Sequence, residues 1–171
     1  YEFTEIQRSP EIALVAGEPA RWKAIWPTLA VVGEPFRLAI LAEDIWGNPT
    51  DRADENLLLQ PSAPIGGLPG RVSIRRGDGP LVLEGLRAAS PGDLQLRVLN
   101  ASGSALCVAN PLRIVASAPL RHFWGDLHGQ SEETIGTNSV EDYFAYARDR
   151  AFLDIAGHQG NDFQITDAFW Q

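Results

Sequence analysis

Turn signals divide the first 118 residues into short apolar runs, and this punctuation constrains the fold more than any other feature. The runs are RWKAIWPTLAVV, EPFRLAILAED, GRVSIRR, GPLVLEGL, GDLQLRVLN and ALCVANPLRIVA. Between them stand turn-forming stretches rich in glycine and proline, namely VGEP, WGNP, GGLPG, GDGP, SPGD and NASGS. Short strands at this spacing, with no helical period between them, are typical of an antiparallel β-sandwich.

The alternation within two runs predicts which side chains face the core. The inward positions of one run are Leu94, Leu96 and Val98. They alternate with Gln95, Arg97 and Leu99. The inward positions of the other run are Phe36, Leu38, Ile40 and Ala42.

The stretch GEPFRLAILAEDIWGNPTD resembles the central strand and following turn of bacterial immunoglobulin-like domains. Gly47 and Asn48 are residue types that take left-handed conformations, and Pro49 is expected to stop further strand pairing. Asp44 and Asp51 are interpreted as turn-forming acids, with a Ca²⁺ site as the alternative. The resemblance implies an immunoglobulin-like sandwich.

Composition narrows the class of protein. The chain is 44% hydrophobic and 21% charged, which is ordinary for a soluble globular protein. Its net charge of −8 argues against nucleic-acid or anionic-membrane partners, and no stretch reaches the roughly 20 apolar residues that span a bilayer. The single cysteine, Cys107, excludes an internal disulfide and is expected to be buried and inert. The chain has no Met and begins at Tyr1, so we expect a processed protein or an excised piece, with its localisation open.

Composition changes around Ala116–Pro119, and we predict a boundary there between a sandwich domain, residues 1–118, and a second part, residues 119–171. This second part carries nine acidic and only three basic side chains. It also holds all three histidines, His122, His128 and His158. Such a segment indicates either a cation site or an acidic solvated surface.

The second part has the pattern of a strand, a loop, a helix and a strand. Ser139 is a good N-cap for a helix over residues 139–151, and a short buried strand is predicted over residues 152–156. This order opens an α/β unit, whose strands run parallel. We therefore expect His128 and His158 side by side at the carboxyl ends of adjacent strands, where α/β folds build their sites.

The residues at these strand ends are suited to binding a metal. Asp126 and His128 point the same way on an extended strand, and Gln130 continues that face. Imidazole nitrogen and carboxylate oxygen are good ligands for Zn²⁺, Mn²⁺ or Fe, although Asp126 could instead orient His128. The predicted metal ligands are Asp126, His128, Gln130 and His158. Weaker candidates are Glu132, Glu133 and Asp162, for which a solvated loop is the alternative.

The stretch WGDLHGQSEETIGTNSVEDYFAYARDRAFLDIAGHQGND resembles the opening of the polymerase and histidinol phosphatase (PHP) superfamily, and within it the DUF3604 family. The resemblance implies a metal-dependent hydrolase that cleaves a small-molecule substrate such as a phosphoester, with metal-activated water as the nucleophile. Two positions depart from the family pattern. Gln130 stands where the pattern has a second His, and Gly157 stands where it has Asp. These departures leave three alternatives: a site that binds fewer metal ions, a site that binds a different metal, or a site that has lost its function.

The family fold is a distorted barrel, which the 53 residues from Pro119 onward cannot close. We therefore expect this chain to be the amino-terminal fragment of a longer protein. The missing carboxy-terminal part of that protein would be the fragment's partner. The fragment alone is expected to be inactive and to bind metal weakly or not at all. The alternative is a non-catalytic binding or structural protein, in which the sandwich serves adhesion and the PHP-like region is degenerate.

Overall fold

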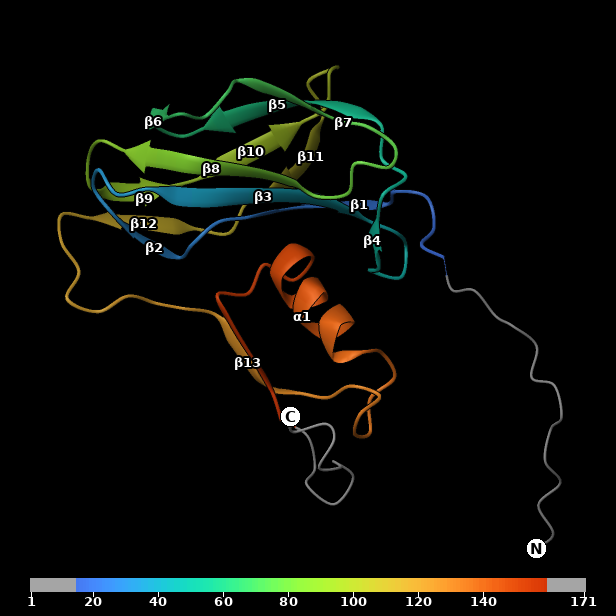
Figure 1. Ribbon diagram of the computed structural model, residues 1–171. Helices are drawn as coiled ribbons and strands as arrows, with labels where there is room; N and C mark the ends of the chain where they lie inside the picture. The colour runs from blue at the N-terminus through green and yellow to red at the C-terminus, as the bar shows by residue number, and fades with distance from the viewer. Residues whose placement is uncertain (1–14, 160–171) are drawn as a thin grey trace, which may run out of the picture.

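Strands β1 to β12 form a β-sandwich in the computed structural model, which describes residues 15–159 (Figure 1). The first six are β1 (Arg21–Ile25), β2 (Leu29–Val31), β3 (Phe36–Glu43), β4 (Pro49–Thr50), β5 (Glu55–Pro61) and β6 (Ile65–Gly66). The next six are β7 (Arg71–Ile74), β8 (Leu81–Ala88), β9 (Gly92–Leu94), β10 (Leu96–Leu99), β11 (Ala105–Val108) and β12 (Leu112–Val115). These strands are called the sandwich below.

The sandwich is built from two main sheets and one small sheet. One main sheet has the order β1-β3-β8-β6, with β4 on β3, and the other has the order β11-β10-β5-β7. The pairs within both are antiparallel, whereas β2 joins β12 in parallel in the small sheet β2-β12-β9. The core contains fully buried side chains from both main sheets and from β12: Leu38, Ile40, Leu57, Leu86, Leu96 and Leu112.

The predicted fold class, a mainly β protein with an immunoglobulin-like antiparallel sandwich followed by a short α/β segment, is confirmed. The inward set on β3 is buried as predicted, and so are Leu94, Leu96 and Val98. The prediction for Leu99 was wrong, because this side chain is only 4% exposed. Burial also raises the pKa of the half-buried Cys107 thiol to about 11, in agreement with an inert thiol.

The chain continues below the sandwich as a strand, a helix and a strand: β13 (Gly125–Gly129), α1 (Val140–Asp149) and β14 (Ile155–His158). These three elements are called the βαβ segment. Figure 1 shows α1 lying beneath the sheet that contains β1 and β3. Within residues 15–159, no helix is long and apolar enough to span a lipid bilayer.

Strand β3 is buried on both of its faces. While Leu38 and Ile40 face the sandwich core, Ala39 and Leu41 face the other way and are 1% and 3% exposed. The side chain that covers them is Phe152, from the turn between α1 and β14. The βαβ segment is thus packed against the outer face of the sandwich through an apolar contact.

The Asp44 carboxylate organises the turn after β3. Its oxygens accept hydrogen bonds from the backbone N–H of Trp46 and Asn48, both at 2.9 Å, and from the amide of Asn48 at 3.1 Å. They also accept one from the backbone N–H of Gly17 at 3.0 Å, which ties the incoming chain to the turn. These bonds, led by that of Gly17, hold the pKa of Asp44 well below its usual value of 3.8. Asp44 is therefore a turn-forming acid.

Two details of this turn differ from the prediction. Gly47 does take a left-handed conformation, with φ of 90°, but Asn48 does not. Its side chain binds Asp44 instead, which an ordinary backbone conformation allows. Pro49 does not stop pairing, because it lies opposite Glu43 in the short pair of β3 and β4. Proline is tolerated there because β4 is a two-residue strand that pairs only with β3.

Replacing Asp44 with Asn is expected to lower stability most at neutral pH. Because the folded-state pKa lies below 3.8, the stabilisation from the carboxylate is fully present above that pH and is lost as pH falls through the folded-state pKa. Urea unfolding should show a large gap between wild type and Asp44→Asn at about pH 7 and a smaller gap at about pH 3. Asp51→Asn, at an exposed acid, is the control, and an equal gap at both pH values would contradict the assignment.

Candidate site at the ends of β13 and β14

Strands β13 and β14 pair in parallel, as the sequence predicts. Their register places Gly125 opposite Ile155 and Gly129 opposite His158, with an irregularity between Asp126 and Gly129. The connecting helix begins after Ser139, whose hydroxyl accepts a hydrogen bond from the backbone N–H of Asp142 at 3.0 Å. The predicted cap is therefore confirmed, and His128 and His158 come from the ends of adjacent strands.

The predicted strand over residues 152–156 is placed too early. Phe152 has a left-handed backbone with φ of 55° and is buried against the sandwich, so the chain cannot be extended there. The strand begins only at Ile155, and it includes His158 rather than ending before it.

His128 and Asp126 are exposed, and their hydrogen bonds lead to different partners. The backbone N–H of His128 donates to Asp126 Oδ1 at 2.9 Å, so this carboxylate oxygen holds the main chain of its neighbour. Ring nitrogen Nδ1 of His128 lies 3.0 Å from Gln159 Oε1 on the adjacent strand end. Its Nε2 has no hydrogen-bond partner among residues 15–159 and is therefore the nitrogen available to a ligand.

His158 is held in a less exposed cluster under the loop that follows β13. Its Nε2 lies 2.9 Å from the hydroxyl of Ser131, which is fully buried. The ring of Tyr143, from α1, meets the imidazole edge-on with centroids 6.2 Å apart. Burial, together with the nearby Asp126 carboxylate, raises the pKa of Tyr143. Its hydroxyl donates to Gly157 O at 3.3 Å.

Gln130 ties the end of β13 to the end of β14. Its Nε2 donates to the backbone oxygen of Gln159 at 2.6 Å, and its Oε1 accepts from the hydroxyl of Thr134 at 2.5 Å. A carbonyl oxygen can only accept, so this pairing fixes which end of the amide faces which partner. To bind a metal, Oε1 would have to give up Thr134.

The two glutamates, Glu132 and Glu133, are exposed and lie in the loop between β13 and α1. The backbone N–H of Glu132 donates to Asn138 O at 2.8 Å, and that of Glu133 donates to Ser131 Oγ at 3.3 Å. These contacts shape the loop through its main chain, and neither carboxylate forms an ion pair with another described residue. The last candidate, Asp162, lies outside the described residues.

The described residues do not form a complete metal site. Within residues 15–159, no group of three or more His, Cys, Asp or Glu side chains could hold a metal ion. At the strand ends, Asp126 is hydrogen-bonded to the main chain of His128. The side chains of His128 and Gln130 both contact Gln159. The ligand set Asp126, His128, Gln130 and His158 stays a prediction.

Three residues of this region escaped the sequence analysis: Ser131, Tyr143 and Gln159. Ser131 and Gln159 each stand directly beside a predicted ligand in the sequence, which is the one signal that pointed to them. Tyr143 lies within the predicted helix of residues 139–151, which by itself gives it no role at the strand ends. Its contact with His158 depends on how α1 packs, which residue spacing does not show.

Gly129 leaves room for the ring of Tyr143. A Cβ atom at this position would lie 2.0 Å from Tyr143 Cζ, far inside van der Waals contact. Gly136 is similar, since its Cβ would lie 2.7 Å from the backbone carbon and oxygen of Gln130. The glycines of this region therefore allow α1 and the loop to approach the end of β13 closely.

Gly129→Ala is expected to destabilise the βαβ segment by about 1–3 kcal/mol, because Tyr143 must move to make room for the methyl group. Urea unfolding monitored by hydrogen exchange of β14 measures the effect. Gly70→Ala is the matched control, since its Cβ would meet nothing within 4 Å. Adding Tyr143→Ala to Gly129→Ala should restore part of the loss, and no difference between the two glycine variants would contradict the contact.

Gln130→Met is expected to cost about 1–2 kcal/mol, because it leaves the Gln159 carbonyl without its side-chain donor and the Thr134 hydroxyl with only the Ser131 carbonyl, at 3.2 Å. Faster hydrogen exchange at the Gln159 amide, which donates to Gly129 O, reports the local loss. Gln60→Met, at an exposed position of β5, is the matched control. Equal exchange in both variants would show that Gln130 does not tie the strand ends together.

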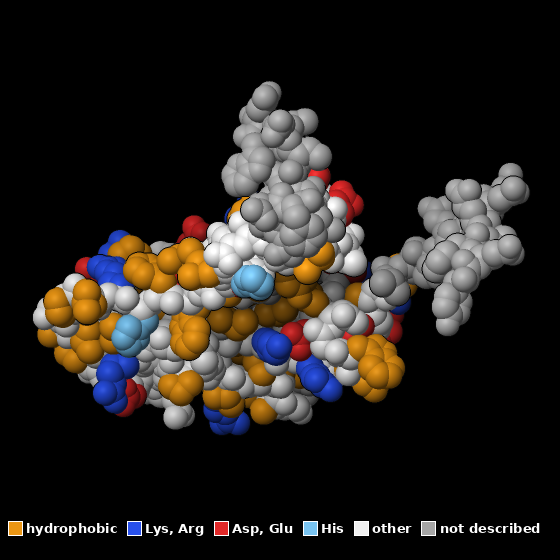
Figure 2. All heavy atoms as spheres, turned by 90° about the horizontal axis from the view of Figure 1, so that it is seen from below, with side chains coloured by type: hydrophobic (Ala, Val, Ile, Leu, Met, Phe, Trp, Pro, Cys, Tyr) orange, Lys and Arg blue, Asp and Glu red, His pale blue; other side chains and the backbone are white. Residues whose placement is uncertain are grey.

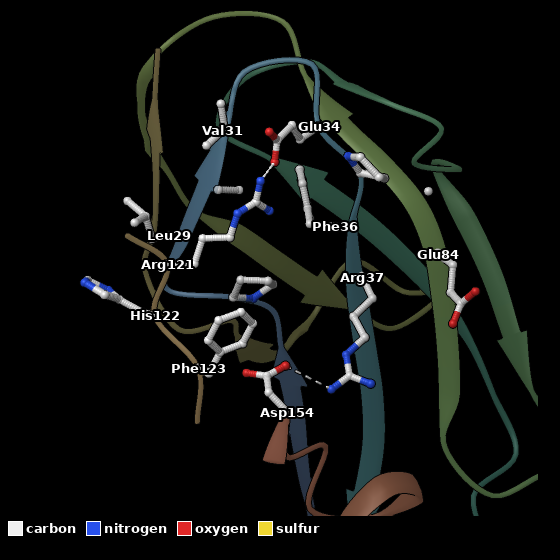
Figure 3. A pocket seen from close by; sticks show the side chains of 14 residues that line it. Leu29, Val31, Glu34, Phe36, Arg37, Glu84, Arg121, His122, Phe123 and Asp154 are labelled. Atoms are coloured by element: carbon white, nitrogen blue, oxygen red, sulfur yellow. Dashed lines mark hydrogen bonds and ion pairs between the residues drawn. The ribbon is translucent and has the colours of Figure 1, made fainter. Parts of the chain in front are cut away.

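Several cavities lie between the sandwich and the part of the chain that follows it, and two of them meet at Arg37 and Asp154. One, of about 350 Å³, is shown in Figure 3, where Arg121 points toward Glu34 and Arg37 toward Asp154. The other, of about 330 Å³, is lined mainly by apolar side chains, among them Trp26 and Trp124. Pro27, Arg37 and Asp154 line both of these cavities.

Comparisons with known proteins give weak likenesses. No protein-family model and no curated protein matches the chain. Among solved structures, a glycosyl hydrolase family 2 member from Bacteroides cellulosilyticus matches 58% of this chain at 16% identity and a TM-score of 0.49. The Escherichia coli adhesin FdeC matches 61% at 20% identity and a TM-score of 0.43. The match spans 15% of the hydrolase chain and 34% of the adhesin chain, and likenesses this weak assign no functional residue here.

Proposed function

We propose that residues 119–171 are the first β-α-β portion of a metal-dependent hydrolase domain of PHP type, and that residues 1–118 form a separate sandwich domain beside it. The observation that carries this proposal is the parallel pairing of β13 and β14, with His128 and His158 at their carboxyl ends. Enzymes with parallel sheets build their sites at this edge. The motif GDLHGQS supplies the resemblance to the superfamily.

The exposed apolar side chains of this region support a larger domain. Leu127 on β13 is 63% exposed and Ile155 on β14 is 49% exposed, while Phe123 and Trp124 just before β13 are 62% and 60% exposed. Figure 2 shows apolar side chains spread over this face of the molecule. Parallel sheets normally have both faces covered, so further strands and helices are the cover we expect.

In the proposed enzyme, a divalent ion such as Zn²⁺, Mn²⁺ or Fe would activate water for hydrolysis of a small phosphoester. His128 would bind it through Nε2, and Asp126 and His158 would be the next candidates. The remaining ligands would have to come from outside residues 15–159. By this proposal the present chain binds metal weakly and does not turn over substrate.

A non-catalytic binding role is the second candidate, and the two hydrogen bonds of the Gln130 side chain favour it. The amide of Gln130 is engaged by Gln159 and Thr134, so the residue in place of the family's second His already has a structural role. The PHP-like region would then be degenerate. Adhesion or assembly would fall to the sandwich.

Metal titration of the chain, purified without chelator, tests the first proposal. We expect Zn²⁺ or Mn²⁺ to bind, and His128→Ala or His158→Ala to weaken binding by about tenfold or more. His122→Ala, at an exposed histidine of the same segment, is the control and should leave affinity unchanged. If all three variants lose affinity equally, or if neither His128→Ala nor His158→Ala weakens binding, the site is wrong and the binding role is favoured.

A further inference from the structure

Arg37, on the outer face of β3, reaches across to the turn that precedes β14. Its Nη2 lies 3.0 Å from the backbone oxygen of Phe152, 3.3 Å from that of Leu153 and 3.5 Å from Asp154 Oδ1. These three acceptors are consecutive residues of one short turn. A single guanidinium nitrogen of the sandwich therefore holds the turn by two carbonyls and a carboxylate.

The Asp154 side chain carries this connection on to β13. While Oδ1 faces Arg37, Oδ2 accepts a hydrogen bond from the backbone N–H of Trp124 at 3.0 Å. The backbone N–H of Asp154 in turn donates to Trp124 O at 2.8 Å. Trp124 directly precedes β13 and stands two residues before Asp126, so one carboxylate joins the sandwich to the start of the strand that bears the candidate site.

The backbone of Phe152 shows that the turn is held firmly. Its φ of 55° is a conformation that residues with side chains avoid, and it persists only where surrounding contacts enforce it. Those contacts are the packing of the ring on Ala39 and Leu41 and the bond from Arg37 to the Phe152 carbonyl. The apolar contact with Phe152 and the hydrogen bond to its carbonyl therefore both come from residues of the same strand, β3.

We propose that Arg37 is a positioning residue, and that the sandwich sets the placement of β13 and β14 through the Arg37–Asp154–Trp124 connection. The sandwich then helps to fix the positions of the ends of β13 and β14, instead of only being joined to them by the chain. This inference does not depend on a metal or on catalysis. It therefore stands or falls separately from the proposed function.

Hydrogen exchange in Arg37→Met, which keeps an apolar stem and removes the charge, tests the proposal on the full chain. We expect exchange at the amides of Trp124, Asp154 and Gln159 to become about tenfold faster, the change that follows from losing a hydrogen bond to a charged group. Amides of β10 should be unchanged. Arg113→Met is the matched control, because Arg113 pairs with Asp93 at 2.8 Å within the sandwich and should leave the three reporter amides unaffected.

Combining Arg37→Met with Asp154→Asn shows whether Arg37 acts through Asp154. If it does, Arg37→Met should accelerate the Gln159 amide much less in the Asp154→Asn background than in wild type. Arg37→Lys, which keeps the charge, should recover part of the protection. The proposal is overturned if exchange rises uniformly across the sandwich and the βαβ segment, if the two substitutions are additive, or if the reporter amides do not change.

Discussion

The burial of β3 on both faces is the constraint on which the rest of the structure depends. A strand with one apolar face would complete the sandwich and leave its outer side to water. Here Ala39 and Leu41 make the second face apolar as well, so another part of the chain must cover it. Phe152 does so, and the position of the βαβ segment follows from that contact.

The sequence predicted those parts of the fold that depend on local periodicity and capping. The inward set on β3, the cap at Ser139 and the parallel order of β13 and β14 all follow from spacing and turn chemistry. Strand β5 was missed because the acids before it and Pro61 at its end resemble a loop, although Leu57 and Leu59 face the core. Phe152 was assigned to a strand because no local pattern distinguishes an inserted aromatic from a strand residue.

For the candidate site, the type and order of the residues predicted where the two histidines lie. They did not predict which side chains the histidines contact. Both histidines are at the ends of paired strands, as motif order implies. Their partners, Gln159 for His128 and Ser131 for His158, depend on a register irregularity and on a loop folded against Gly136. An amide such as Gln130 has the same donors and acceptors whether it binds a metal or the main chain, so only its neighbours decide between these roles.

The uncovered strands of the βαβ segment also have a consequence for colloidal behaviour. At neutral pH the nine acidic groups of residues 119–171 outnumber the three basic ones, so the exposed faces around Leu127 and Ile155 repel their copies in other molecules. Near the sequence pI of about 4.8 this repulsion vanishes while the apolar surface remains. We therefore expect the chain to be least soluble at mild acidity, where the apolar side chains that β13 and β14 expose are no longer offset by charge.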